Sequence, residues 1–383
     1  MKPQIRLFSV LLIAALLTAC GSPAAAPTPT SAPPTATAVP PTPTSMPPTV
    51  VSTPLTPAVE PEPTDTSPEP AAMPEPHGLR YDAPEYAIDG PYAVGVRYFT
   101  IPAAAKNDRD LTVSVWYPAQ KSADVANEMV YEMKFPPGEI PAFTVLGHAN
   151  PDAPPDLSGG PYPLVVYSHS HWSFGQENAY LSEHLASKGF VVISTDHEDN
   201  WSTAFGPIAP EAYLRRPQEI SRQIDFVEDL SSDDGSLSGL ANTERVGVAG
   251  WSQGAVTALA AAGARFDLAN AAAWCKQNPE TAELNSTACP DMEGKEAELA
   301  TFAGLTDAPE GLWPDWSDPR VGAVVAMAPS TISFGEEGIQ SLSVPVMFMV
   351  GSGETSSDGG FEMASPYESV ASEDKAKVVF DSR

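Results

Sequence analysis

The sequence predicts an α/β fold in which a mostly parallel central sheet carries helices on both faces. From Tyr92 onward, short runs rich in Val, Ile and Leu alternate with segments of helical spacing, which is typical of a chain that alternates strands and helices. Several runs are apolar at nearly every position, as expected of parallel strands buried on both faces. The first two runs have no helix between them, so we expect an antiparallel hairpin at the edge of the sheet.

The periodicity predicts eight strands and three helices in this part of the chain. The strands are expected at Ala93–Ile101, Leu111–Tyr117, Leu164–Ser168, Phe190–Thr195, Arg245–Gly250, Val321–Ala326, Val344–Val350 and Lys377–Phe380. The helices are expected at Glu177–Lys188, Pro217–Leu230 and Gln253–Ala264. Gly189 follows the first helix, where a C-cap residue is expected.

Two insertions interrupt the alternation, at about residues 120–161 and 265–319. The second follows the helix after the fifth strand. Open α/β sheets bind ligands at the carboxyl ends of their strands, so we interpret this insertion as a cap over that edge. The alternative is surface elaboration without a role at the site.

Residues 1–19 predict a secretory signal peptide. Lys2 and Arg6 precede an uncharged apolar run over residues 7–17, which is shorter than the about 20 residues of a membrane-spanning helix. The segment Leu17-Thr18-Ala19-Cys20-Gly21 resembles the lipobox of bacterial lipoproteins, which implies that Cys20 is lipidated. We expect an exported protein anchored to a bacterial membrane in the cell envelope; the alternative is a plain secretory peptide with an incidental Cys.

Residues 20–78 are rich in Pro, Thr, Ser and Ala and predict a disordered, polyproline-like stalk ahead of a folded domain at 79–383. The whole chain has 20 Lys and Arg against 49 Asp and Glu, a formal net charge of −29. A phosphate backbone is bound by a basic surface, so this composition excludes a nucleic-acid partner. It also disfavours strongly anionic substrates.

Cys275 and Cys289 are expected to form a disulfide, because they lie 14 positions apart in a protein predicted to be exported. A metal-binding pair is the alternative. However, no His follows Cys289, and the spacing fits no common zinc pattern.

The most specific motif is Gly250-Trp251-Ser252-Gln253-Gly254, which lies between an expected strand and an Ala-rich helix. A bare G-x-S-x-G pattern is weak evidence, but a strand before it and a helix after it are the context of a nucleophile elbow. Side chains two positions either way from the Ser would clash with the neighbouring strand or helix. We therefore expect Ser252 to be a nucleophile at a helix N-terminus, which stabilises negative charge.

A second segment has related organisation: one expected strand runs into Ser168-His169-Ser170-His171-Trp172, and the next strand ends in Asp196-His197. From about Tyr92 to Arg383, the chain resembles α/β-hydrolases, specifically the bacterial relatives of platelet-activating-factor acetylhydrolase and dienelactone hydrolase. The resemblance implies an α/β-hydrolase fold and carboxylic-ester hydrolysis through an acyl-enzyme. It also implies an oxyanion hole formed by the backbone N–H groups of Gln253 and His171, although the family often has Gly-rich residues at 170–172.

The resemblance also places the catalytic acid a few residues after the expected strand Val344–Val350. Glu354 occupies this place and is the first choice, with Asp358 in reserve. The alternative is that Glu354 is a solvated loop carboxylate.

A catalytic base is not found where the family carries it. The family order is Ser, acid, His, yet all six His precede Ser252: His77, His148, His169, His171, His184 and His197. The base commonly follows the last strand, which here lies close to Arg383. We therefore expect a C-terminally incomplete chain whose catalytic His lies beyond Arg383.

A metal-dependent hydrolase is a further alternative, because His169 and His171 follow one expected strand and residues 196–199, Asp-His-Glu-Asp, follow its neighbour. The same turns occur in metal-free hydrolases of this family. The preferred interpretation is therefore that His169 and His197 shape the oxyanion loop by hydrogen bonding, and no metal or other cofactor is expected.

Trp172, Phe174 and Trp251 adjoin the expected oxyanion and nucleophile positions. Aromatic walls suit the apolar parts of an ester substrate, although they equally suit ordinary packing. The sequence thus predicts a lipid-anchored serine hydrolase acting on a small-molecule or polymeric ester. Its main rival is a non-catalytic surface binding protein that retained the hydrolase fold.

Overall fold

The computed structural model describes residues 87–105, 107–121, 129–133, 143–198, 209–277, 294–351 and 364–381. The chain divides into two compact units, residues 1–72 and 73–383. Every described residue belongs to the second unit. The predicted signal peptide, Cys20 and the whole predicted stalk lie outside the described residues.

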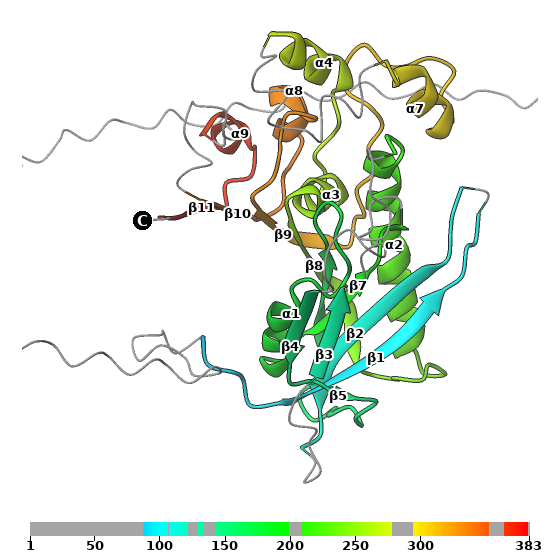
Figure 1. Ribbon diagram of the computed structural model, residues 1–383, viewed down its shortest axis with the longest axis vertical. Helices are drawn as coiled ribbons and strands as arrows, with labels where there is room; N and C mark the ends of the chain where they lie inside the picture. Colours follow the sequence, from blue (N-terminus) through cyan, green and yellow to red (C-terminus); the bar gives the residue numbers. More distant parts are fainter. Residues whose placement is uncertain are drawn as a thin grey trace, which may run out of the picture. The chain divides into compact units, whose positions relative to one another are not determined.

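Among the described residues, nine strands form one sheet in the order β11-β10-β9-β8-β6-β7-β2-β1-β5. Figure 1 shows β11 and β10 toward one end of this sheet and β2 and β1 toward the other. The strands are β1 (Ala93–Ile101), β2 (Leu111–Ala119), β5 (Asn150–Pro151), β6 (Tyr162–Ser168), β7 (Val191–Thr195), β8 (Ala241–Trp251), β9 (Val321–Met327), β10 (Val346–Gly351) and β11 (Lys375–Phe380). Within this sheet, β2 alone runs antiparallel to its neighbours β1 and β7. This order and direction are those of the α/β-hydrolase fold, so the predicted fold class is confirmed.

All eight predicted strands are present, but the first insertion contains further strands that the sequence did not predict. Strands β3 (Met129–Met133) and β4 (Phe143–Gly147) form a separate antiparallel hairpin. The two residues of β5 pair in parallel with β1. The predicted edge hairpin of β1 and β2 therefore forms, but β5 lies outside it.

The described helices are α1 (Ala179–Ser187), α2 (Ala212–Ser231), α3 (Gln253–Ala261), α4 (Leu268–Gln277), α7 (Glu296–Phe302), α8 (Gly335–Gln340) and α9 (Ala364–Ser369). Helix α2 begins five residues before the predicted start and contains Pro217. Proline favours the first position of a helix, which is why the sequence suggested a start there. In the part of the chain that the structure describes, no helix combines the length and apolar character needed to cross a membrane.

Alternate residues of the central strands pack into two separate hydrophobic clusters, one on each face of the sheet. In β6, Leu164 and Val166 face the cluster that contains α2 and α3, whereas Val165 and Tyr167 face the cluster that contains α1. Figure 1 accordingly shows α1 and α2 on opposite sides of the sheet. Burial on both faces explains the nearly continuous apolar runs in the sequence.

The β3–β4 hairpin is attached to α1 through the buried carboxylate of Glu183. Tyr131 donates its hydroxyl hydrogen to Glu183 Oε1 at 2.5 Å, and Trp116 Nε1–H donates to the Tyr131 oxygen at 2.9 Å. Glu183 also accepts the backbone N–H groups of His148 and Ala149. Burial alone would raise the pKa of Glu183, but the hydrogen bonds from His148 and Tyr131 outweigh it and lower the pKa.

The second insertion returns to the main core beside α3. Trp313 is fully buried there, and its backbone N–H donates to the Phe266 carbonyl at 2.8 Å. Cys275 in α4 is disulfide-bonded, whereas Cys289 lies outside the described residues. The pairing of these two residues and the cap role of the insertion stay predictions.

Candidate active site

Ser252 occupies a strained turn between β8 and α3. Its φ is 52° and its ψ is −116°, a backbone conformation that non-glycine residues rarely adopt and that is concentrated at functional sites. Its N–H donates to the Met327 carbonyl at the end of β9 at 2.8 Å. The turn therefore holds Ser252 at the carboxyl edge of the sheet.

The two glycines of the motif are required by close backbone contacts. A Cβ atom at Gly250 would lie 2.2 Å from the Gly254 oxygen, and one at Gly254 would lie 1.9 Å from the Ser168 oxygen. Both values are far below any contact that real Cβ atoms make. The steric reason that the sequence suggested for these glycines is thus present, and the contact at Gly254 joins the nucleophile turn to the end of β6.

The loop after β6 is held by a buried carboxylate. Glu177 accepts the Ser170 N–H at 2.8 Å, the Ser170 hydroxyl at 2.7 Å and the Tyr167 hydroxyl at 2.7 Å. Burial raises the pKa of Glu177 despite these hydrogen bonds, which act in the opposite direction. Further along, Trp172 has a φ of 51°, so the loop turns sharply directly after His171.

The two N–H groups expected to bind an oxyanion are unoccupied by other described residues. Gln253 is the first residue of α3, and the N–H groups in the first turn of a helix have no intrahelical acceptor. In the described ranges, neither the Gln253 N–H nor the His171 N–H donates to a backbone or side-chain acceptor. Both groups are free to bind an anionic oxygen.

The aromatic side chains near this turn differ in exposure. Trp172 and Trp251 are 40% and 45% exposed, whereas Phe174 is 4% exposed and packs in the α1-side cluster. Phe174 therefore supports the loop from beneath. The His171 ring lies 4.3 Å from the Trp172 ring between centroids, and burial, followed by the charge of Arg216, lowers the pKa of His171 to about 4.

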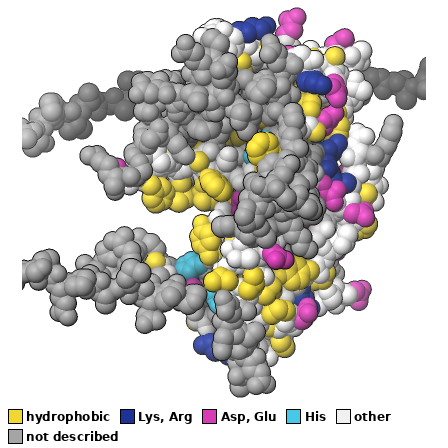
Figure 2. Space-filling view, viewed as in Figure 1, with side chains coloured by type: hydrophobic (Ala, Val, Ile, Leu, Met, Phe, Trp, Pro, Cys, Tyr) yellow, Lys and Arg dark blue, Asp and Glu magenta, His cyan; other side chains and the backbone are white. Residues whose placement is uncertain are grey.

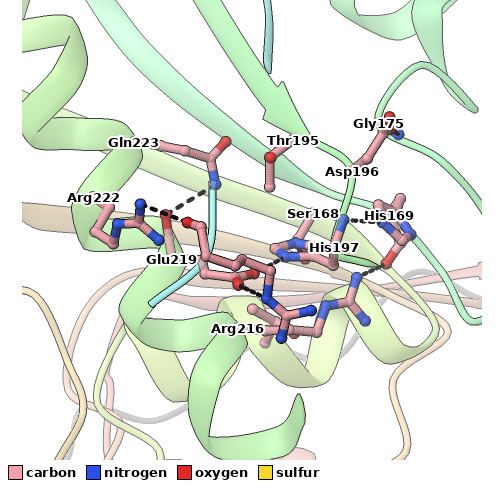
Figure 3. A network of polar contacts seen from close by, with 12 residues as sticks. Ser168, His169, Gly175, Thr195, Asp196, His197, Arg216, Glu219, Arg222 and Gln223 are labelled. Carbon is pink, nitrogen blue, oxygen red and sulfur yellow. Dashed lines mark hydrogen bonds and ion pairs between the residues drawn. The ribbon is translucent and has the colours of Figure 1, made fainter. Parts of the chain in front are cut away.

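A buried chain of hydrogen bonds lies below this loop (Figure 3). The Ser168 hydroxyl lies 3.0 Å from His197 Nε2, and His197 Nδ1 lies 2.5 Å from Glu219 Oε2. Because an ionised carboxylate only accepts, Nδ1 carries the proton and Nε2 accepts from Ser168. The connectivity is that of a Ser–His–acid triad, but all three side chains are at most 1% exposed, so no substrate can reach Ser168.

His169 is engaged on both sides of its ring. Its Nε2 accepts the His197 backbone N–H at 2.9 Å, and its Nδ1 lies 2.7 Å from the Ser170 oxygen. Burial, followed by the charges of Arg216 and His197, lowers the pKa of His169 and keeps it neutral. Both nitrogens of His169 and His197 therefore serve hydrogen bonds within the protein. Within the described ranges, no group of three His, Cys, Asp or Glu side chains could hold a metal ion.

A cavity of about 300 Å³ lies beside the nucleophile turn at the carboxyl ends of β8 to β11. Its lining is mainly apolar and includes Tyr180, Trp251, Met327 and Phe380. Figure 2 shows exposed apolar side chains gathered in this region of the molecule. The carboxylates Glu354 and Asp358, predicted as acid and reserve acid, follow β10 and lie outside the described residues.

Part of the chain matches a known family in sequence. Residues 150–219 match the family described as platelet-activating factor acetylhydrolase, isoform II. The matched segment contains β6, α1, β7 and the beginning of α2, and hence the whole buried chain from Ser168 to Glu219. The chain is related to the α/β-hydrolase superfamily.

Among solved structures, this chain is similar to the ferulic acid esterase from Streptomyces cinnamoneus. The two chains are 18% identical, and the match covers 78% of this chain and 75% of the other, with a TM-score of 0.46. No curated protein matches the chain in sequence.

Sequence reasoning missed two residues near this site, Arg216 and Glu219. Both side chains are buried, at 0% and 1% exposed, on the face of α2 that also carries Ile220 and Ile224. A signal was present, because charged residues interrupt an otherwise apolar helix face, and buried charges are rare unless paired. The signal does not identify the partners, His169 and His197, which follow β6 and β7.

Asp196 allows a test of the loop electrostatics. It accepts the Gly175 N–H at 2.7 Å, and burial raises its pKa from 3.8 to about 6. The folded state thus binds a proton at Asp196 more tightly than the unfolded state does. The stability that this proton contributes is fully present below about pH 4 and is lost as the pH rises through about 6. Asp196→Asn keeps the acceptor and removes the charge. We expect it to be more stable than the wild type by about 1–2 kcal/mol at pH 8, a value reduced for partial exposure.

Urea unfolding at pH 8 and pH 4.5 measures this effect. The stability difference between Asp196→Asn and the wild type should shrink toward zero at the lower pH. Asp229→Asn, at an exposed position of α2, serves as the control and should show little change. A difference that is the same at both pH values would contradict the assignment.

Proposed function

We propose that this protein hydrolyses carboxylic esters through an acyl-enzyme formed on Ser252. The observation that carries the proposal is the strained Ser252 turn at the carboxyl edge of the sheet, where close backbone contacts leave no room for a Cβ at Gly250 or Gly254. Among the described residues, the N–H groups of Gln253 and His171 have no acceptor. Strain of this kind is retained where function requires a particular geometry. The match of residues 150–219 to acetylhydrolases supports the same reaction class.

In the proposed reaction, Ser252 Oγ attacks the ester carbonyl while a base accepts its proton. The developing oxyanion accepts hydrogen bonds from the Gln253 and His171 N–H groups, and the start of α3 adds the favourable end of a helix dipole. Collapse of the tetrahedral intermediate expels the alcohol, which takes the proton from the base. Water then releases the acid in a second round of the same chemistry.

The acid in this proposal comes from the chain after β10, the neighbour of β11 in the sheet. These strands are parallel neighbours that end at Gly351 and Phe380, so the residues that follow them begin at the same sheet edge as Ser252. Glu354 is the proposed acid, with Asp358 in reserve. In the family order the base is a His that follows the acid, whereas every His of residues 1–383 precedes Ser252, so no residue of this sequence is assigned as the base.

The cavity is lined by apolar side chains that include Tyr180, Trp251, Met327 and Phe380. Apolar walls bind the apolar parts of a ligand, so the cavity favours an uncharged substrate with an apolar portion. The net charge of −29 acts against strongly anionic esters. Short-acyl esters, phospholipid-derived esters and polyesters fit this class.

The experiment that tests the proposal combines an ester panel with labelling by a fluorophosphonate. Peptide mapping should place the label on Ser252. Hydrolysis of at least one uncharged ester should accompany the label. A protein that binds esters without label or turnover would be the non-catalytic binder instead.

We also propose that Cys20 anchors the exported protein to a membrane. The support is the lipobox-like segment 17–21. A covalent acyl chain contributes about 0.8 kcal/mol per buried CH₂ group, so the wild type should sediment with membranes when expressed in a bacterium that processes lipoproteins. Cys20→Ala should move the protein to the soluble fraction. Release of unlipidated wild-type protein into the medium would contradict the anchor.

A further inference from the structure

Helix α2 carries two charged side chains into the interior of the protein. Arg216 and Glu219 lie three residues apart and therefore on one face of the helix. They are 0% and 1% exposed. Burying charged groups is costly unless well-placed partners compensate. The contacts of these two side chains therefore indicate their role.

Each of the two residues contacts the end of a different strand. Arg216 donates from a terminal guanidinium nitrogen to the His169 carbonyl, directly after β6. Glu219 accepts from His197 Nδ1 at 2.5 Å, two residues after β7. The other Glu219 oxygen lies 3.3 Å from Arg109 Nε. Figure 3 shows Arg216 and Glu219 directed from α2 toward the two histidines.

The two histidines join these contacts to the loop that carries His171. The His197 N–H donates to His169 Nε2 at 2.9 Å, and His169 Nδ1–H donates to the Ser170 oxygen at 2.7 Å. The backbone of this loop root also lies against the first turn of α3. A Cβ atom at Gly254 would come within 1.9 Å of the Ser168 oxygen and 2.7 Å of the His169 oxygen.

We propose that Arg216 and Glu219 are positioning residues that hold the His171 loop in register with the Ser252 turn. The inference rests on the proposed function, because it assigns these residues to the oxyanion site of that reaction. Neither residue touches substrate; each acts through His169 or His197. We call the buried Ser168–His197–Glu219 chain the brace. It fixes the orientation and tautomer of the His197 ring, and Ser168 does not act as a nucleophile.

The expected effect is on turnover. A small misplacement of a catalytic group can cost about 10²-fold in rate, and loss of one oxyanion donor costs about 10² to 10³. A loosened loop weakens the hydrogen bond from the His171 N–H to the oxyanion, which is one of two such bonds in the transition state. Ground-state binding uses this hydrogen bond less, so KM should change little.

The test compares Glu219→Gln with Glu228→Gln. Both positions lie on α2, but the Glu228 side chain is 59% exposed and pairs with Arg320 at the surface. Gln at 219 still accepts from His197 but loses its charge toward Arg109 and Arg216. We expect kcat of Glu219→Gln to fall by roughly 10- to 100-fold with less than a threefold change in KM, and Glu228→Gln to match the wild type.

A second readout needs no catalysis. Amide hydrogen exchange of residues 168–175 should quicken at least about tenfold in Glu219→Gln, while exchange in α3 and β9 stays as in the wild type. Arg216→Lys keeps the charge and one donor toward His169. It should give an intermediate loop exchange rate, and it carries the test if Glu219→Gln does not fold.

The outcomes separate the two proposals. Faster loop exchange in the variants of a protein that hydrolyses no ester would support the brace and refute the proposed function. Active variants with unchanged loop exchange would overturn the brace and leave the function standing. A loss expressed in KM alone, or equal effects in Glu228→Gln, would also overturn it.

Discussion

Gly254→Ala is expected to destabilise the protein by about 3 kcal/mol or more and to reduce ester hydrolysis at least 100-fold. The added Cβ would lie 1.9 Å from the Ser168 oxygen and 2.6 Å from its carbonyl carbon. These are backbone atoms of a buried strand, so they cannot rotate away as a flexible side chain would. Relief requires α3 to move from β6, and this movement carries the Gln253 N–H away from the loop that bears His171.

Gly247→Ala is the matched control for this change. Gly247 lies in β8, the strand that leads into the same turn, but its Cβ would meet only Val165 Cγ2 at 3.8 Å, an ordinary contact. Urea unfolding and the initial rate on an uncharged ester measure both variants. A Gly254→Ala protein as stable and as active as Gly247→Ala would show that the turn tolerates separation from β6.

The sheet could be predicted because its strands are buried on both faces and are therefore apolar along their length. The same reasoning fails for β5, since Asn150 and Pro151 form too short a segment to show any period. It also misplaced the start of α2, where Pro217 lies inside the helix. Tertiary packing of residues 212–216 against the core makes the helix begin before the position that local preference suggests.

The candidate site divides in a similar way. The Ser252 turn could be predicted because the two glycines that it requires lie within two positions of Ser252. Gly250 and Gly254 mark the positions where a Cβ atom would clash with neighbouring backbone. The brace under the loop could not, because it depends on which charges of α2 meet which strand ends. Arg216 and Glu219 contact residues at least 22 positions away, and helical periodicity holds no information about such partners.

Two serines of this site have features of a nucleophile, and their geometry decides between them. Ser168 has the hydrogen-bonded His and acid, at 3.0 and 2.5 Å, but is fully buried. Ser252 has the strained turn, partial exposure and the adjacent N–H groups, while among the described residues no side chain hydrogen-bonds to its hydroxyl. Access by substrate is required for attack, so Ser252 is the proposed nucleophile.

Ser252→Ala should therefore abolish hydrolysis, lowering turnover by about 10⁴- to 10⁶-fold, as loss of the nucleophile does in other serine hydrolases. Ala retains the Cβ and the same strain at φ 52°, so the unfolding free energy should stay within about 0.5 kcal/mol of the wild type. Rate measurements with an active-site titration, together with urea unfolding, check both statements. The fluorophosphonate label should disappear from this variant.

Ser168→Ala should behave in the opposite way. It removes the hydroxyl that His197 Nε2 accepts from and leaves a buried acceptor unsatisfied, which costs about 1–3 kcal/mol. Because the His197 ring is still held by Glu219, turnover should fall by less than tenfold, and Ser252 should still take the label. If Ser168→Ala lost all turnover while remaining folded and Ser252→Ala kept it, the buried triad would be the catalytic one, and the protein would have to open between α2 and the sheet to admit its substrate.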